Sequence, residues 1–139
     1  MGKIKILKRV HVYDVYNKKF SEPTDILVEE GHIAKIGDIS QDEQSTAEII
    51  DCSGKYAMPG LFDSHTHLAT LAILRPESKA WLLQSFLDKG FTQIRDVGGP
   101  IDNLKNLTQE ITSGKLQGPD IFYSGPMLEK SPLHWEIYN

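Results

Sequence analysis

The chain has 139 residues, of which 40% are hydrophobic and 24% charged, and its formal net charge at pH 7 is −4. These values are typical of a folded globular protein and exclude an intrinsically disordered chain. Because 15 Lys and Arg residues stand against 19 Asp and Glu residues, no basic excess is available to neutralise phosphates, and we expect no nucleic-acid partner. The single cysteine excludes an internal disulfide.

The apolar stretches predict where the protein resides. The N-terminal residues 1–5 lack the uninterrupted apolar core of a signal peptide. The longest apolar runs fall well short of the about 20 residues that a membrane-spanning helix needs. We therefore expect a soluble, cytoplasmic protein with no membrane partner.

The first part of the chain predicts β structure. Residues 25–38 are expected to form a hairpin, with Gly31 at the turn position that requires a positive φ. The polar stretch 39–48 predicts a loop, and 48–52 a further strand. β-branched residues crowd the beginning of the chain: Ile4, Ile6, Val10, Val12 and Val15.

After residues 54–56 the pattern changes to an alternation of strand and helix. Strands are predicted at 91–97 and 120–124, and each is preceded by a helix that ends at a glycine, Gly90 or Gly114. This alternation is the pattern of βαβ units and a parallel sheet. The helical residues expected in the core are Ala80, Trp81, Leu82, Leu83, Phe86, Leu87, Ile101, Leu104, Leu107 and Ile111.

His65 and His67 are the main candidates for chemistry. Residues two apart in a strand project from the same face, so the two imidazoles are expected to converge on one point. Neutral imidazole is the commonest side-chain ligand of zinc and related metals. Asp63 has the same parity and is placed to orient a ligand or contact the metal. The alternative is a set of polar residues at a strand end, but α/β barrels place their sites at such ends.

Asp96 ends the next predicted strand, just before Gly98 and Gly99. A carboxylate at this position can support a ligand histidine through a hydrogen bond. It can equally cap a turn, and the pattern leaves open whether Asp96 or Arg95 faces inward.

The remaining histidines carry weaker signals. His134 follows the third strand in a proline-containing loop and is a candidate for substrate binding, with an ordinary surface residue as the alternative. His11 and His32 lie in the β segment and receive no site role. Cys52 is expected to be a small packed residue.

Two stretches resemble the opening of the amidohydrolase superfamily. They are the hairpin 26–37 and residues 50–68, which contain the pattern Pro-Gly-x-x-Asp-x-His-x-His. Residues 90–99 resemble the second barrel strand of the branch that contains imidazolonepropionases and prolidase-like enzymes, and residues 118–126 resemble the third.

The resemblance implies an α/β fold in which a TIM-type (β/α)8 barrel carries a small β-sandwich built from both chain ends. Residues 1–56 would be the N-terminal half of the sandwich, and residues 57–139 the first strands and helices of the barrel. The latter segment has 83 residues, whereas a whole barrel takes about 250. The barrel is therefore expected to be incomplete in this chain.

The resemblance also implies a metal-dependent hydrolase that cleaves amide or other C–N bonds of a small molecule through a metal-activated water. The metal would be divalent, zinc above all, with one or two ions in the complete enzyme. His65 and His67 match the first two ligands and Asp63 the motif aspartate. The other ligands and the general base come from later strands, so this chain offers no catalytic residue beyond possible support from Asp63 and Asp96.

The length favours an N-terminal fragment of such an enzyme. We expect a homo-oligomer or association with the missing part of the barrel, and a small-molecule substrate. The alternatives are a non-catalytic truncated fragment, a subunit that needs a second chain to complete the barrel, or a small metal-binding module that uses His65, His67 and Asp63.

Overall fold

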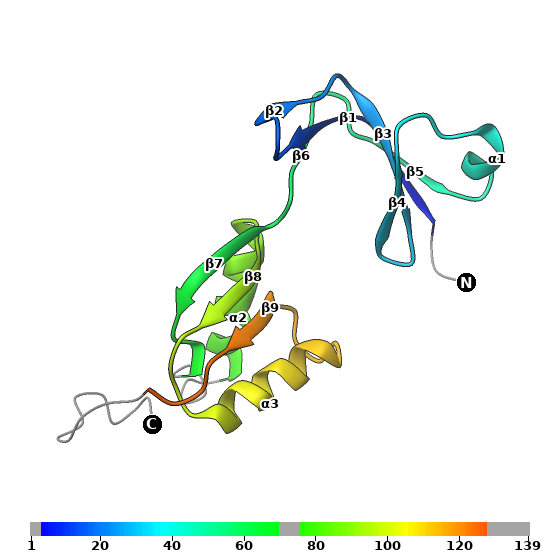
Figure 1. Ribbon diagram of the computed structural model, residues 1–139. Coiled ribbons are helices and arrows are strands. Elements are labelled where there is room, and N and C mark those ends of the chain that lie inside the picture. Colours follow the sequence, from blue (N-terminus) through cyan, green and yellow to red (C-terminus); the bar gives the residue numbers. More distant parts are fainter. Residues whose placement is uncertain (1–3, 70–75, 128–139) are drawn as a thin grey trace. The chain divides into compact units, whose positions relative to one another are not determined.

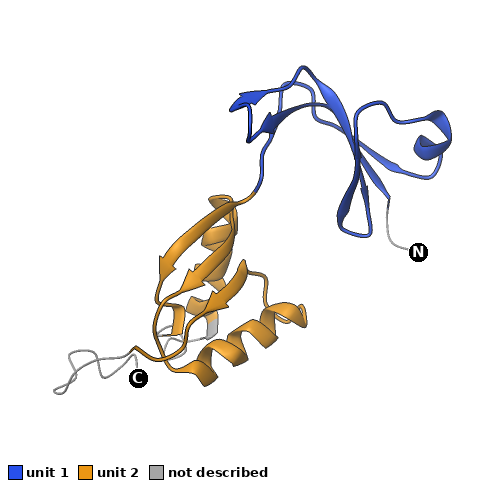
Figure 2. Cartoon of the chain, viewed as in Figure 1, with its two compact units in different colours: residues 1–59 blue, residues 60–139 orange. Residues whose placement is uncertain are grey.

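The computed structural model describes residues 4–69 and 76–127. The chain divides into two compact units, residues 1–59 and 60–139 (Figures 1 and 2). This division falls three residues after the predicted boundary at residue 56. The short strand β6 (Tyr56–Ala57), which straddles the predicted boundary, pairs with β1 and so belongs to the first unit.

The first unit is a six-stranded sheet organised around its first strand. The path through the sheet is β2-β1-β3-β4, and β5 and β6 both pair with β1 in parallel. Two small apolar clusters lie within the unit, and Cys52 is buried in one of them, which confirms the prediction for this residue. The remaining strands of the unit are β1 (Lys5–Asp14), β2 (Lys19–Phe20), β3 (Thr24–Glu29), β4 (His32–Ile36) and β5 (Glu48–Asp51).

A bulge divides β1 into two halves with different partners. The register against β3 shifts between Leu7 and Val10, and Arg9 lies in the shift with a φ of 59°. Residues 5–8 pair with β5, whereas His11 and Val12 pair with β6. β1 thereby pairs with β5 along its first half and with β6 along its second half.

The predicted hairpin is confirmed, but the predicted loop at 39–48 is wrong in part. Glu30 and Gly31 join β3 to β4 with φ values of 50° and 81°, the signs of a type I′ turn. Within the expected loop lies a short helix, α1 (Gln41–Gln44). Ser40 and Glu43 form a capping box at its start, and this Ser-x-x-Glu signal was present in the sequence.

The second unit is a parallel sheet covered by helices, as the alternation predicted. The strand order is β7-β8-β9, and both pairings are parallel. None of the helices that the structure describes is long and apolar enough to cross a membrane. The elements are β7 (Leu61–Thr66), α2 (Pro76–Asp88), β8 (Phe91–Asp96), α3 (Ile101–Thr112) and β9 (Asp120–Tyr123).

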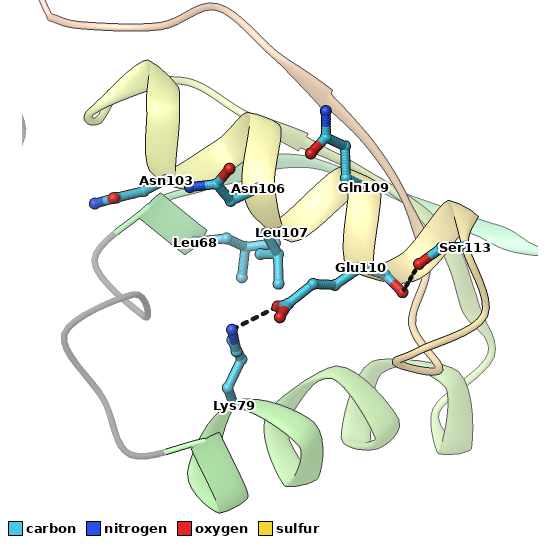
Figure 3. A pocket seen from close by; sticks show the side chains of 8 residues that line it. All are labelled: Leu68, Lys79, Asn103, Asn106, Leu107, Gln109, Glu110 and Ser113. Atoms are coloured by element: carbon cyan, nitrogen blue, oxygen red, sulfur yellow. Dashed lines mark hydrogen bonds and ion pairs between the residues drawn. The ribbon is translucent and has the colours of Figure 1, made fainter.

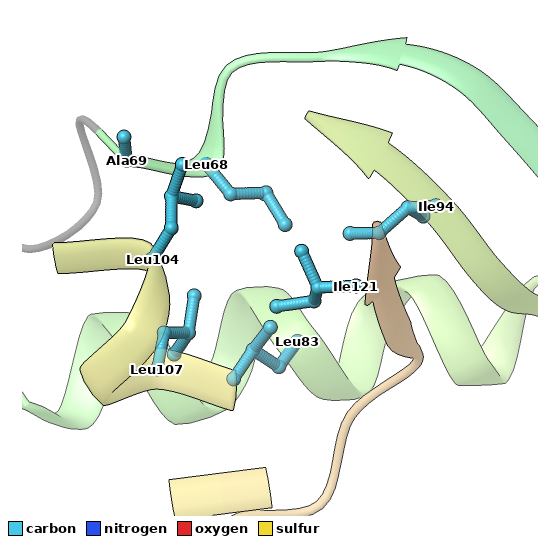
Figure 4. Packing of buried hydrophobic residues seen from close by; sticks show 7 residues of the cluster. All are labelled: Leu68, Ala69, Leu83, Ile94, Leu104, Leu107 and Ile121. Atoms are coloured by element: carbon cyan, nitrogen blue, oxygen red, sulfur yellow. The ribbon is translucent and has the colours of Figure 1, made fainter. Parts of the chain in front are cut away.

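Both helices of the second unit pack on one face of the sheet. Leu83 of α2 and Leu104 of α3 belong to one buried cluster with Ile94 and Ile121 of the strands (Figure 4). The prediction that Trp81 belongs to this core is wrong, because its side chain is 71% exposed. At 3.6 residues per turn, a residue two positions before Leu83 lies about 200° away around the helix, and so faces solvent.

Candidate metal centre

The carboxyl end of β7 brings the two predicted histidines together. His65 is the second-last residue of β7, and His67 directly follows Thr66, the last strand residue. Their ring centres are 5.4 Å apart, with the ring planes at 77°. Two imidazoles that bind one zinc ion through bonds of about 2.1 Å have centres within about 6 Å of each other. The spacing therefore fits a shared ion.

The His67 ring has a defined orientation. Its Nδ1 lies 3.1 Å from the carbonyl oxygen of Gly98. Because a carbonyl oxygen only accepts, Nδ1 must carry the hydrogen and donate it, and in the neutral ring Nε2 then carries the lone pair. Histidine ligands of metals commonly donate their other ring N–H to a carbonyl in this way.

Asp63 is directed at the backbone of its own strand. Its Oδ1 accepts a hydrogen bond of 3.1 Å from the backbone N–H of His65. Within residues 4–69 and 76–127, no group of three or more His, Cys, Asp or Glu side chains is arranged to hold a metal ion. Among the described residues, the candidate centre thus consists of a pair of imidazoles.

Asp96 is fully buried, whereas Arg95 is exposed. One carboxylate oxygen accepts from the backbone N–H groups of Leu68 and Ala69, the latter at 3.1 Å. The other oxygen accepts from the N–H of Gly98 at 3.0 Å. These hydrogen bonds all go to backbone groups, so Asp96 caps the two loops that follow β7 and β8.

The carboxyl ends of the three strands are joined to one another by backbone hydrogen bonds. Val97 donates to the carbonyl of Thr66 at 3.0 Å, and Ser124 donates to that of Asp96 at 3.1 Å. Gly99 donates to the carbonyl of Gly125 at 3.2 Å. Sequence reasoning predicted neither the contact of the Gly98 carbonyl with His67 nor these backbone hydrogen bonds between the strand ends. The one available signal was the Asp-x-Gly spacing of residues 96–98, which favours a turn closed by the aspartate side chain.

Two of the other three histidines belong to the first unit. His134 lies outside the described residues. His11 belongs to the first unit, where it stacks on Tyr56 with ring centres 5.0 Å apart. His32 is exposed on β4, with Nδ1 3.0 Å from the carbonyl oxygen of Glu30.

A hollow of about 650 Å³ lies between α2 and α3 (Figure 3). The Lys79 ammonium spans it to the Glu110 carboxylate at 2.6 Å. Hydrogen bonds from Lys115 and Lys79 lower the pKa of Glu110 below its ordinary value. Sequence reasoning did not predict this hollow, whose lining residues are Leu68, Lys79, Asn103, Asn106, Leu107, Gln109, Glu110 and Ser113.

Comparison with curated proteins finds enzymes over part of their length. An adenine deaminase of Clostridium perfringens is 41% identical over 76 residues, which are 54% of this chain and 13% of that enzyme. An imidazolonepropionase of Clostridium tetani is 32% identical over 107 residues, 74% of this chain and 25% of that enzyme. The chain thus spans a quarter or less of these two relatives. No family model matches the chain.

Solved structures share the fold over nearly the whole chain. A structure described as an amidohydrolase superposes with a TM-score of 0.76 at 24% identity, covering 98% of this chain and 39% of that one. A Xaa-Pro dipeptidase with bound methionine superposes with a TM-score of 0.75 at 25% identity, covering 96% of this chain and 36% of that one. Together with the curated relatives and the paired histidines at the end of β7, these likenesses place the chain in the amidohydrolase superfamily, in the part that includes imidazolonepropionases and prolidase-like enzymes.

Proposed function

We propose that the chain is the metal-binding beginning of a hydrolase that cleaves amide or other C–N bonds of a small molecule. The observation that carries the proposal is the pair of imidazoles 5.4 Å apart at the carboxyl end of β7. The names of the relatives, a deaminase, an imidazolonepropionase and a dipeptidase, support this class of reaction.

His65 and His67 would hold a divalent metal, with zinc the first choice and one or two ions in the complete enzyme. When bound, such an ion lowers the pKa of a water to about 7 and polarises the bond under attack. The chain's own contribution is orientation, because the Gly98 carbonyl holds the His67 ring through Nδ1.

The second unit would form the first strands of a (β/α)8 barrel, and the first unit would form half of a β-sandwich. Further ligands and a general base would come from barrel strands beyond those described, supplied by a longer chain or by another subunit. We place the complete enzyme in the cytoplasm, with a small-molecule substrate and no nucleic-acid or membrane partner.

A second candidate is a non-catalytic fragment, or a subunit that needs another chain to complete the barrel. The small number of metal-binding side chains near His65 among the described residues favours it. Proton transfer requires a positioned acceptor in addition to an activated water, so we expect the purified 139-residue chain to hydrolyse no dipeptide or cyclic amide. Turnover that chelation abolishes would contradict this expectation.

Metal binding itself is tested by zinc titration calorimetry. We expect the strongest zinc site to disappear in the double variant His65→Ala/His67→Ala. The matched control is His11→Ala/His32→Ala, which removes two imidazoles of the first unit and should leave that site unchanged. Zinc binding that survives the first double change and is lost in the second would place the metal elsewhere.

A further inference from the structure

The His67 ring is linked to Asp96 by a closed circuit of hydrogen bonds. The residue after His67, Leu68, donates its backbone N–H to one oxygen of the Asp96 carboxylate. The other oxygen receives the N–H of Gly98 at 3.0 Å. The circuit closes where Nδ1 of His67 donates to the Gly98 carbonyl at 3.1 Å.

We propose that Asp96 is a positioning residue for His67: by holding Gly98, it fixes the ring in the Nδ1–H tautomer and directs Nε2 to the metal. The role of the circuit in metal binding rests on the proposed function. The hydrogen bonds themselves do not depend on a metal. Asp96 acts through backbone groups and touches neither metal nor substrate.

Two features make the circuit specific to a carboxylate. Both oxygens of Asp96 accept, one from the loop after β7 and one from the loop after β8, and an amide has only one acceptor oxygen. Asp96 is fully buried, so water does not replace a lost partner easily.

The packing around Gly98 leaves no room for a side chain. Gly98 is buried, and a Cβ at this position would lie 2.3 Å from Cγ of Met127 and 3.6 Å from Cε1 of His67. The next residue, Gly99, is held by its N–H to the Gly125 carbonyl at 3.2 Å. The carbonyl that selects the His67 tautomer is therefore fixed from both sides.

Nitrogen NMR of the metal-free, ¹⁵N-histidine-labelled 139-residue chain tests the inference. In the spectrum of the neutral ring, we expect His67 in the Nδ1–H form. Asp96→Asn should give a mixture of tautomers and weaken zinc binding about 10–100-fold. Asp102→Asn, which changes a carboxylate that is 86% exposed, should alter neither property.

The wild-type spectrum decides the geometry without any variant. An Nε2–H tautomer of His67 overturns the inference, as does an Nδ1–H tautomer that persists unchanged in Asp96→Asn. If Asp96→Asn fails to fold, Asp96→Glu is tested instead, because it retains two acceptor oxygens and should keep His67 mainly in the Nδ1–H tautomer. A folded Asp96→Glu variant that loses this tautomer overturns the inference. A chain with the expected tautomer that binds no zinc refutes the proposed function alone.

Discussion

Asp25 stabilises the bulge of β1 at Arg9. Its Oδ1 accepts the backbone N–H of Arg9 at 3.0 Å, and its Oδ2 lies 2.7 Å from the ammonium of Lys8. Burial alone would raise the pKa of Asp25, but the hydrogen bonds from Lys8 and Arg9 outweigh it and the pKa is lowered. The carboxylate thus supports the positive φ of Arg9, which a side chain otherwise disfavours.

We expect Asp25→Asn to lower the free energy of unfolding by about 1–3 kcal/mol at pH 7, the cost of losing hydrogen bonds to a charged group. Because the folded pKa is depressed, the stabilisation is complete above the unfolded value of about 3.9 and is lost as pH falls through the folded value. Urea unfolding at matched protein concentration measures both effects.

The control is Asp38→Asn, which removes an exposed carboxylate from the same unit. A difference between wild type and Asp25→Asn that persists unchanged at about pH 2, below the unfolded pKa of about 3.9, would show that the charge of Asp25 is not the source of the stabilisation.

At the candidate site, the convergence of His65 and His67 was predictable because it follows from the period of a strand. For Asp96 the sequence left two roles open, support of a ligand histidine and capping of a turn. Its partners in the loop after β7 were not predictable, because Leu68 and Ala69 precede it by 28 and 27 residues in the sequence. Backbone N–H groups carry no residue-specific signal. A buried carboxylate that binds only backbone therefore looks in a sequence like any strand-end aspartate.

Among the elements, the β3–β4 hairpin depends most directly on its turn. Gly31 has a φ of 81°, and a Cβ there would meet nothing within 4 Å. Any cost of a substitution at Gly31 therefore comes from the backbone alone. Glu30 also has a positive φ, 50°, although glutamate is not a residue that favours it.

We expect opposite effects from two substitutions in this turn. Gly31→Ala should lower the free energy of unfolding by about 1–2 kcal/mol, the cost of a left-handed conformation for a residue with a Cβ. Glu30→Asn should raise it by up to about 1 kcal/mol, because asparagine tolerates that conformation and Asn-Gly suits a type I′ turn. Urea midpoints of the two variants measure both changes, and shifts of the same sign would contradict the turn assignment.

Helix and strand periodicity predicted most elements, and the errors have physical causes. The four residues of α1 are too few to show a period, so only its capping box marked the helix. Trp81 was assigned to the core as part of an apolar stripe with Phe86 and Leu87, although its angle around α2 directs it to solvent. The register of the strands depends on contacts between distant segments and was not available from local pattern.

On the scale of the second unit, both helices that the structure describes there cover the same face of the sheet, and the opposite face carries neither of them. Phe122 follows the buried Ile121 in β9, so it lies on the face opposite the helices. Its ring centre is 5.9 Å from that of Phe62 in β7, and the two side chains are 53% and 47% exposed. In the described part of the chain, β7 and β9 each have a single neighbouring strand.

This surface predicts that the chain associates. Parallel sheets are found with both faces covered, and unpaired strand edges recruit other chains. We expect size exclusion with light scattering to give a mass above the 15.6 kDa of one chain. Either a second copy of the chain or further strands of a barrel would cover this face of the sheet and pair with the edge strands β7 and β9.

Phe122→Lys should shift the chain toward the monomer, because association would then have to bury a charge among apolar groups. The matched control is Tyr16→Lys, which places the same charge on a 96% exposed position of the first unit and should leave the mass unchanged. If wild type instead elutes as a sharp 15.6 kDa species that unfolds cooperatively, the prediction is wrong and the sheet face with Phe62 and Phe122 is stable in water. If association persists in Phe122→Lys but not in Tyr16→Lys, the contact includes the surface of the first unit at Tyr16.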